Sequence, residues 1–339
     1  MFVNSDNYIK YLKLWLITLF LLIIIMVGVG GLTRLTDSGL SITEWELFTG
    51  ILPPFNIDEW SFYFSEYKKI PEYQNINYNM TLDEFKIIFY WEYAHRLLAR
   101  IVGLFSFIPL LIFSFKFRNN QFYSNKYYLI FLLICLQGFI GWYMVSSGLI
   151  KNNDVSHFRL SVHLTLALFI LCLIFWFILD LFNTKRFQIK ISNLLLFFIL
   201  ALIILQIILG AFLSGLDGGL IYNSWPDMNG VFFPSDVNMS DYLSSQLFYN
   251  ASIIQFFHRI TAYILLLFII FLNYLFLKKK LNLSNILFFD FAIILQIFLG
   301  IITLVSGVEI RYASLHQLGS IFVLCSYLLI LYKSSSQQL

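Results

Sequence analysis

Long apolar runs separated by short polar segments dominate the chain. Five of them contain no charged residue, and each is close to the ~20 residues that a helix needs to cross the hydrocarbon core of a bilayer. These five runs are residues 14–33, 127–150, 160–179, 191–216 and 312–332. Three further runs, at 87–115, 253–277 and 284–306, hold a few polar residues. Because backbone amides cannot stay unpaired in lipid, the pattern predicts eight transmembrane helices.

The composition agrees with this all-α, polytopic membrane fold. Of the 339 residues, 59% are hydrophobic and only 12% are charged, which is more apolar than one soluble core requires. The three cysteines all lie in predicted spans, so we expect no disulfide framework. The first run lacks a small-residue cleavage site, and we expect it to be a retained span.

Lysine and arginine are distributed unevenly between the loops, which predicts the orientation. The segments joining spans 2 to 3, 4 to 5 and 6 to 7 contain Lys116, Arg118, Lys126, Lys185, Arg186, Lys190, Lys278, Lys279 and Lys280. The loops after spans 1 and 5 are instead acidic. We therefore expect both termini to be cytoplasmic, a bacterial inner membrane as the location, the lipid bilayer as surroundings and no nucleic-acid partner.

The two halves of the chain repeat each other. Four pairs of segments match in the same order: GLTRLTDSGLSITEW with AFLSGLDGGLIYNSW, EYAHRLLARIVGL with QFFHRITAYILLL, LQGFIG with LQIFLG, and SVHLTLALF with SLHQLGSIF. Four spans return the chain to its starting side, so the halves have the same orientation. The repeat predicts two pseudo-symmetric four-helix bundles, residues 1–186 and 187–339.

Four of the five histidines occupy matched positions in this repeat: His95 with His258, and His163 with His316. Each lies in the first turns of a span that enters from the outer face. Ionisable side chains inside a bilayer are costly and are functional candidates. They can form hydrogen bonds between helices, but one imidazole from each of two helices also suits a haem iron. Zinc is less suitable, because a closed site needs four ligands.

We therefore predict one bis-histidine haem site in each half. Arg96, Arg100 and Arg259 lie within about a turn of these histidines, and they are candidates for pairing with haem propionates. The alternative for these arginines is that their side chains extend toward the membrane interface. His157, the fifth histidine, has Ile310 as its counterpart, and we expect it to be an interfacial loop residue.

The halves differ at Glu92, whose counterpart is Gln255. Glu92 precedes His95 by three residues, so the two side chains share one helical face. A carboxylate beside a haem edge can accept a proton or stabilise developing positive charge. The alternative is a structural salt bridge to Arg96 or Arg100. The asymmetry predicts that the first half performs chemistry that the second half does not.

These segments together resemble the haem A synthase family, membrane enzymes that convert haem O to haem A for terminal oxidases. The resemblance depends on GGLTRLTDSGLSITEW, EFKIIFYWEYAHR, SVHLTLALF, FFHRITAY and LHQLGSIF in this order. Some members carry a cysteine pair in the first outer loop, whereas residues 34–90 contain none. The chain therefore resembles the cysteine-free branch of proteobacteria and mitochondria.

The resemblance implies a function for each half. The N-terminal half would bind the substrate, haem O, near His95 and His163, and the C-terminal half would hold one haem b through His258 and His316. Glu92 matches the catalytic carboxylate of the family, which oxidises the C8 methyl of haem O to a formyl group. The implied partners are the haem O synthase that makes the substrate and an unidentified electron donor or acceptor.

Two other functions fit parts of the pattern. A dihaem cytochrome b that transfers electrons from quinol would share the histidine pairs, but it gives no reason for Glu92 to lack a counterpart. A transporter would share the paired halves, but it predicts broken helices near the membrane midplane, where glycine and proline are few.

Overall fold

The computed structural model describes residues 5–46, 49–116, 121–150, 153–184 and 191–335. Helices make up all of the regular secondary structure in these ranges, and eight of them are long and apolar enough to cross a membrane. The prediction of an all-α membrane protein with eight spans is therefore confirmed. Arg118, Lys185, Arg186 and Lys190, on which part of the orientation depends, lie outside the described residues.

The chain divides into two compact units, Met1–Ile174 and Phe175–Leu339. That residues 1–186 and 187–339 each form a four-helix bundle stays a prediction.

One detail of the backbone follows the repeat closely. The matched residues Asp37 and Asp217 come just after the first span of each half, and both adopt a left-handed conformation, with φ of 48° and 49°. Aspartate tolerates this conformation better than most residues, so it ends both helices in the same way.

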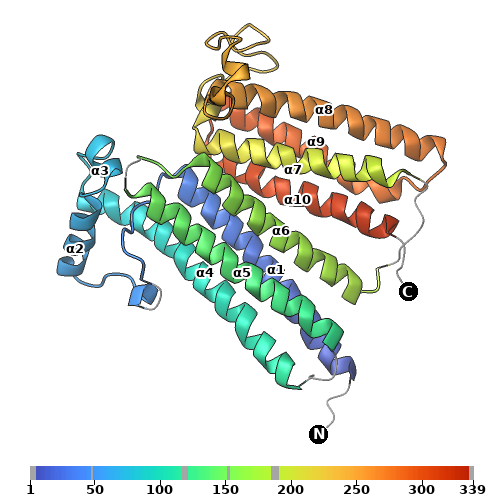
Figure 1. Cartoon of the computed structure of the whole chain (residues 1–339), viewed down its shortest axis with the longest axis horizontal. Coiled ribbons are helices and arrows are strands. Elements are labelled where there is room, and N and C mark those ends of the chain that lie inside the picture. Colours follow the sequence, from blue (N-terminus) through green and yellow to red (C-terminus); the bar gives the residue numbers. More distant parts are fainter. Residues whose placement is uncertain (1–4, 47–48, 117–120, 151–152, 185–190, 336–339) are drawn as a thin grey trace. The chain divides into compact units, whose positions relative to one another are not determined.

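In the first unit, α1 (Ser5–Leu35) packs along α4 (Leu82–Lys116), and α4 packs along α5 (Gln121–Gly148). The fourth long helix, α6 (His157–Leu181), begins in this unit, and Figure 1 shows the four helices running alongside one another. The Trp15 indole donates a hydrogen bond of 2.8 Å to the carbonyl of Phe105, which satisfies a polar group among apolar neighbours.

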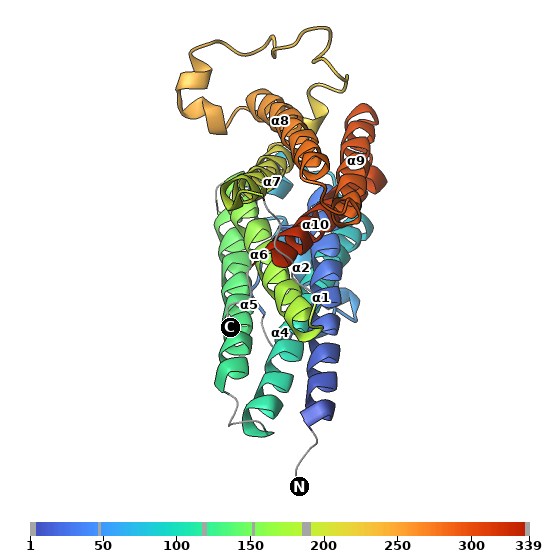
Figure 2. The ribbon, with the colours of Figure 1, turned by 90° about the vertical axis from the view of Figure 1, so that its right-hand side faces the viewer.

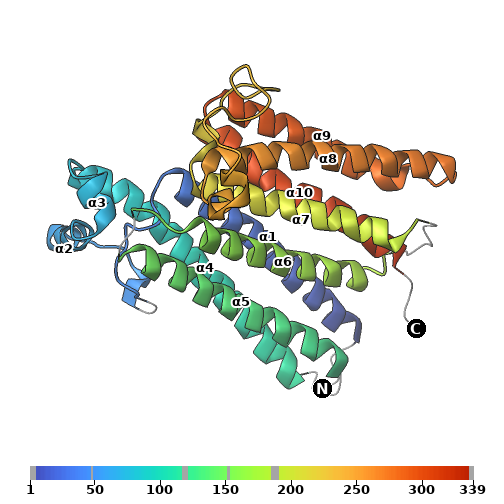
Figure 3. The same ribbon diagram turned by 45° about the horizontal axis from the view of Figure 1, so that its top comes forward.

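The loop after α1 folds into three short helices, η1 (Thr49–Ile51), α2 (Ile57–Tyr67) and α3 (Pro71–Asn75). Asn56 caps α2 by accepting a hydrogen bond of 2.8 Å from the backbone N–H of Glu59. Figure 3 shows α2 and α3 beside the N-terminal end of α4. An aromatic cluster joins these elements and contains Trp60, Phe64, Tyr67, Phe85 and Phe89. This outer segment is therefore a packed structure attached to the first unit.

In the second unit, α7 (Asn193–Gly215) packs along α8 (Ala251–Lys278), and α9 (Ser284–Val305) packs along α10 (Ile310–Ser334). Further contacts join α7 to α10 and α8 to α9. The Asn250 side chain caps α8 through the N–H groups of Ser252 and Ile253. The loop before α8 contains η2 (Gly218–Leu220), η3 (Asp241–Leu243) and η4 (Ser245–Phe248), and Figure 2 shows it beyond the N-terminal end of α8.

Glu72 is a buried carboxyl group in the outer segment of the first unit, with only 5% of its surface exposed. The Tyr67 hydroxyl donates to its Oε1 at 3.2 Å, whereas Oε2 has no hydrogen-bond partner among the described residues. Burial raises the pKa of Glu72 from its ordinary value of 4.5 to about 8, and the charges of Asp154, Glu92 and Asp37 act in the same direction. The folded segment therefore holds a proton near neutral pH.

We predict that the outer segment loses stability as the pH rises. Between pH 4.5 and about 8 the folded state binds a proton on Glu72 that the unfolded state has released, so the stabilisation is complete below this window and is lost through it. Amide hydrogen exchange across α2 and α3 in detergent should be faster at pH 8.5 than at pH 6, after correction for intrinsic exchange. In Glu72→Gln the difference should largely disappear. An unchanged pH response in that variant would contradict this role of Glu72.

Candidate functional site

The four matched histidines lie on alternate long helices, His95 on α4, His163 on α6, His258 on α8 and His316 on α10. Each unit thus contains one pair. The rings of His258 and His316 face each other with centroids 6.4 Å apart and planes inclined at 79°. Metal–imidazole bonds are about 2 Å long, so two rings on opposite sides of one metal ion have centres about 6 Å apart. The spacing in the second unit therefore suits two axial ligands of one iron.

Each of the four imidazoles packs against a glycine of the preceding long helix. A Cβ atom built on Gly30, Gly141, Gly210 or Gly300 would lie 2.8, 2.9, 3.2 or 2.8 Å, respectively, from Cε1 of the neighbouring histidine. Contacts below about 3 Å are too short for a carbon pair, whose optimum separation is about 3.5–4.0 Å. At Gly30, Gly141 and Gly300 a Cβ would therefore force the ring to move, and at Gly210 the fit would be tight. The same arrangement recurs four times, which shows that the repeat extends to the surroundings of the histidines.

Glutamine side chains contact three of these histidines. The Gln137 amide nitrogen lies 3.1 and 3.2 Å from the two ring nitrogens of His163 and donates to its carbonyl at 3.0 Å. The Gln206 amide nitrogen lies 3.2 Å from Nε2 of His258. Gln296 donates to the carbonyl of His316 at 2.9 Å. Each glutamine precedes the packing glycine on its helix by one turn.

Several buried polar atoms at these histidines have no partner among the described residues. They are Nδ1 of His95, His258 and His316, and Oε1 of Gln137, Gln206 and Gln296. Leaving a buried polar group unpaired is costly, so the clusters are suited to a group from outside the chain. Within the described ranges no three His, Cys, Asp or Glu side chains come together as a metal-ion site. Paired imidazoles in apolar surroundings therefore fit a haem better than a closed zinc site.

Glu92 is buried, with 3% of its surface exposed, and both of its carboxylate oxygens are engaged. Oε2 accepts hydrogen bonds of 2.8 Å from the Ser41 hydroxyl and from the backbone N–H of Ile42. Oε1 accepts two bonds from Arg96, at 3.0 Å from Nε and 2.7 Å from a terminal nitrogen. The structural salt bridge considered from the sequence is thus present, and Glu92 also fixes the loop after α1.

Arg96 also binds the outer loop, donating to the carbonyls of Ile42 and Glu44 at 2.7 and 2.9 Å. Arg259 binds the matched carbonyls, those of Tyr222 and Ser224, both at 3.0 Å. The two arginines therefore attach equivalent loops to equivalent helices. Pairing of Arg96 or Arg259 with haem propionates stays a prediction, and here each guanidinium is held by backbone carbonyls.

Gln255 takes the place of Glu92 in the second unit. Its Oε1 likewise accepts from the matched arginine, Arg259, at 3.4 Å, but its bonds to the loop run in the opposite direction. Its amide nitrogen donates to the carbonyls of Gly218 and Tyr222 at 3.0 and 3.1 Å. Glu92 instead accepts from a backbone N–H of its loop. Both side chains fix the loop to the helix, but only Glu92 adds a negative charge near the histidines.

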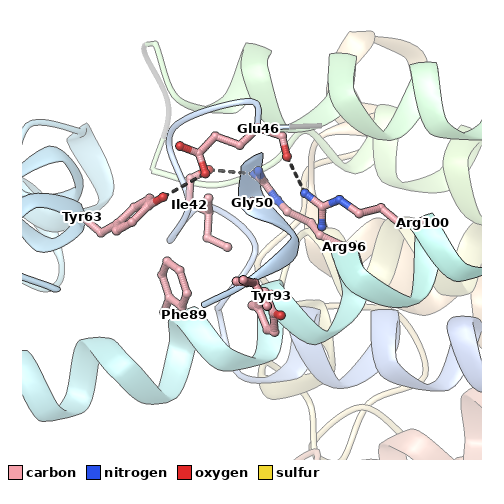
Figure 4. A pocket seen from close by; sticks show the side chains of 9 residues that line it. Ile42, Glu46, Gly50, Tyr63, Phe89, Tyr93, Arg96 and Arg100 are labelled. Atoms are coloured by element: carbon pink, nitrogen blue, oxygen red, sulfur yellow. Dashed lines mark hydrogen bonds between the residues drawn. The ribbon is translucent and has the colours of Figure 1, made fainter. Parts of the chain in front are cut away.

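A small pocket lies beside this network in the first unit and is lined partly by Arg96, Arg100, Tyr93 and Glu46. Figure 4 shows Tyr63 pointing at the Glu46 carboxylate and Arg100 reaching the Glu46 carbonyl. The Tyr63 hydroxyl donates to Glu46 at 2.8 Å. Burial, followed by this bond, raises the pKa of Tyr63 to about 12. Polar contacts within the loop thus hold Glu46 and Arg100, and a role for Arg100 toward a ligand stays a prediction.

The structure differs from the sequence-based expectation at His157. We expected an interfacial loop residue, whereas His157 is the first residue of α6 and is only 6% exposed. Its ring lies 4.4 Å from that of Phe158, centroid to centroid. Helix α6 begins earlier than the sequence suggested. The predicted span was the uncharged stretch 160–179, and Arg159 separates that stretch from His157.

Sequence reasoning missed the residues that surround the histidines. The matched blocks LQGFIG and LQIFLG contained the signal, because each places a glutamine one turn before a glycine on the helix preceding a histidine. The loop residues Ser41 and Ile42 were also missed, and nothing in their residue types marks them, since Ile42 acts through its backbone.

The fold and the repeat define a multi-pass helical membrane protein with a matched pair of histidines in each unit. The sequence profile of the family described as "Cytochrome oxidase assembly protein" matches residues 13–328. The chain is 75% identical to a protein of Pelagibacter ubique (strain HTCC1062) named "Heme A synthase" over 336 residues, which cover 99% of this chain and 100% of that protein.

Proteins of the same name in Rickettsia are more distant. The chain is 43% identical to the Rickettsia bellii (strain OSU 85-389) protein over 93% of this chain and 96% of that protein. It is 41% identical to the Rickettsia prowazekii (strain Madrid E) protein over 91% and 94%. The chain belongs to the haem A synthase family, as its motifs indicated.

The glycine contacts predict opposite effects for two substitutions on α5. Gly138→Ala should stabilise the protein, by up to about 1 kcal/mol, because a Cβ there meets nothing within 4 Å and alanine favours helix. Gly141→Ala should be destabilising relative to Gly138→Ala, because its Cβ would lie 2.9 Å from the His163 ring. Thermal unfolding of both variants in the same detergent measures the difference. Equal gains in melting temperature would show that His163 does not need the glycine.

Proposed function

We propose that this chain is a haem A synthase, which oxidises the C8 methyl group of haem O to a formyl group. The observation that carries the proposal is the difference between two otherwise equivalent histidine sites. Both halves attach the outer loop through a matched arginine, but only the first adds a carboxylate, Glu92, where the second has Gln255. The full-length relatives named "Heme A synthase" support the same function.

The histidine pairs divide between cofactor and substrate in this proposal. His258 and His316 would hold a resident haem b, and their centroid spacing of 6.4 Å supports this. His95 and His163 bind the iron of haem O, the substrate. When bound, haem b supplies one-electron redox chemistry, and the fold keeps it in apolar surroundings that exclude water. Arg96 and Arg259 hold the loops that cover the two sites.

Glu92 acts on the substrate by electrostatic stabilisation. Its carboxylate is fixed by Ser41, the N–H of Ile42 and Arg96, so it cannot move without losing hydrogen bonds. A pre-oriented charge of this kind stabilises positive charge that develops as a methyl group is oxidised. Acting as a proton acceptor would instead require Glu92 to give up one of these contacts. Of the two roles considered for Glu92, proton acceptor and electrostatic stabiliser, the hydrogen bonds therefore favour the second.

The fold and the chemistry of haem O support a proposal for the location, orientation and partners of the protein. We propose a bacterial inner-membrane location with cytoplasmic termini and with the haem sites toward the outer face. The loops after α1 and α7 then lie outside, and Lys278–Lys280 lies inside. Haem O carries a long apolar tail, so a direct partnership with the haem O synthase that makes it is expected. The electron donor or acceptor is a further partner.

Of the alternatives, the dihaem electron-transfer cytochrome has no support in the comparisons, which consistently name haem A synthases. It also leaves Glu92 without a purpose. The helices of a transporter would be interrupted near the midplane, whereas α4 is continuous through Pro109.

Pigment extraction tests the proposed function directly. Membranes of a host that makes haem O but no haem A should contain haem A only when this chain is co-expressed. Chromatography of the extracted haems measures it. Extracts with haem B and haem O alone, from cells in which the protein is present at normal levels, would refute the proposal.

Glu92→Gln should keep the loop in place and lose conversion. The amide oxygen still accepts from Ser41 and Ile42, and Arg96 keeps its own bonds to the carbonyls of Ile42 and Glu44. The amide NH2 group cannot accept from Arg96, and the negative charge is gone, so turnover should fall about a hundredfold, the effect of losing one preorganised electrostatic contact. Asp83→Asn is the control, because it removes an exposed carboxylate from the same helix. The haem A to haem O ratio should fall in Glu92→Gln and stay normal in Asp83→Asn. Normal conversion by Glu92→Gln would exclude the assigned role.

A further inference from the structure

The arginine that follows the first histidine of each pair is neutralised in one unit and not in the other. In the first unit Arg96 forms an ion pair of 2.7 Å with Glu92, and its Nε donates to the same carboxylate at 3.0 Å. In the second unit the neutral Gln255 takes the place of Glu92, and its Oε1 lies 3.4 Å from a terminal nitrogen of Arg259. Arg259 makes no ion pair among the described residues. Buried charges are generally paired, so this guanidinium is suited to an anion from outside the chain.

One N–H group of Arg259 is not used by the outer loop. The two terminal nitrogens donate to the carbonyls of Tyr222, Ser224 and Asp227. Nε is buried and has no acceptor in the part of the chain that the structure describes. The Asp227 carboxylate does not supply one, because its Oδ1 accepts from the Ser224 hydroxyl and from the N–H of Gly230.

A second unused donor lies one turn further along α8. Tyr263 follows Arg259 by four residues, so the two share one face of the helix, and they are close enough to interact electrostatically. The Tyr263 hydroxyl is buried and has no hydrogen-bond partner within the described ranges. Its counterpart in the repeat is Arg100, which instead donates to the Glu46 carbonyl of the first outer loop. Two unused donors beside an unneutralised positive charge suit a ligand with two acceptor oxygens and a negative charge.

We propose that Arg259 and Tyr263 form a carboxylate-binding site, in which Nε and the hydroxyl donate to a propionate of the haem held by His258 and His316. The inference rests on the proposed function and deepens it, because it adds Tyr263 to the residues that bind the resident haem. Arg259 directly follows His258 in the chain, which keeps the anion site beside the haem position. A propionate supplies both the acceptors and the charge, whereas a buried water molecule supplies acceptors alone.

Removing the carboxylates from the haem tests this. The purified full chain with His163→Ala, in which only the second histidine pair remains, is loaded with haem B or with its dimethyl ester. Transfer of the haem to excess apomyoglobin measures the rate of release. With haem B, Tyr263→Phe should release about tenfold faster, the effect of one hydrogen bond to a charged group. With the ester the same substitution should change the rate by a much smaller factor, because an ester oxygen accepts only an uncharged bond.

Tyr274→Phe is the matched control, because it removes the hydroxyl of an exposed tyrosine on the same helix. It should release both haems at the rate of its parent. The same comparison in the chain with His163 intact makes the test independent of the His163→Ala substitution, and there only one of two release phases should change. An equal effect of Tyr263→Phe on haem B and on the ester would overturn the proposal, since the hydroxyl would then act without the carboxylate. No effect on either haem would overturn it too.

Haem A formation by the chain with His163 intact separates this inference from the proposed function. A chain that shows the carboxylate-dependent effect of Tyr263→Phe but makes no haem A would contradict the proposed function and leave the binding site standing. Full haem A formation, with release that does not depend on the carboxylates, would do the reverse.

Discussion

The close approach of an imidazole to a helix backbone is the contact on which the site depends. A histidine inside a bilayer has little water to solvate it, and each of these four is placed by a glycine that leaves space for the ring. In the second unit the result is a pair of rings whose centroids are 6.4 Å apart, a spacing that one iron can bridge. The small residue acts here by permitting contact between helices, as small residues do at many helix interfaces in membranes.

Duplication explains why the two halves resemble each other, and it makes the positions at which they differ informative about function. Arg96 and Arg259 bind matched loop carbonyls, so the scaffold that presents each histidine pair is the same. On that scaffold the halves differ at Glu92, whose counterpart is Gln255. In the proposed function the carboxylate of Glu92 supplies charge for oxidation.

The amino-acid sequence predicted the fold class well, because eight long apolar runs have no other stable form in lipid. It also predicted the matched histidines, since the repeat is visible without coordinates. The structure of the outer segment could not be predicted from the sequence, because α2, α3 and the burial of Glu72 depend on aromatic packing between residues far apart in sequence. The loop contacts of Arg96 were equally hidden, since they are made to backbone carbonyls, which have no residue signature. The expectation that His157 is a loop residue was wrong because α6 begins earlier than the apolar run indicated.

The central claim is that each half of the chain holds one haem between its two histidines, and counting the haems tests it most directly. Purified protein supplied with excess haem should contain two haems per chain by pyridine haemochrome assay against protein mass. His316→Ala and His163→Ala should each retain one, and the double variant should retain none. A wild type with one haem per chain at saturation, or single variants that keep two, would contradict the account.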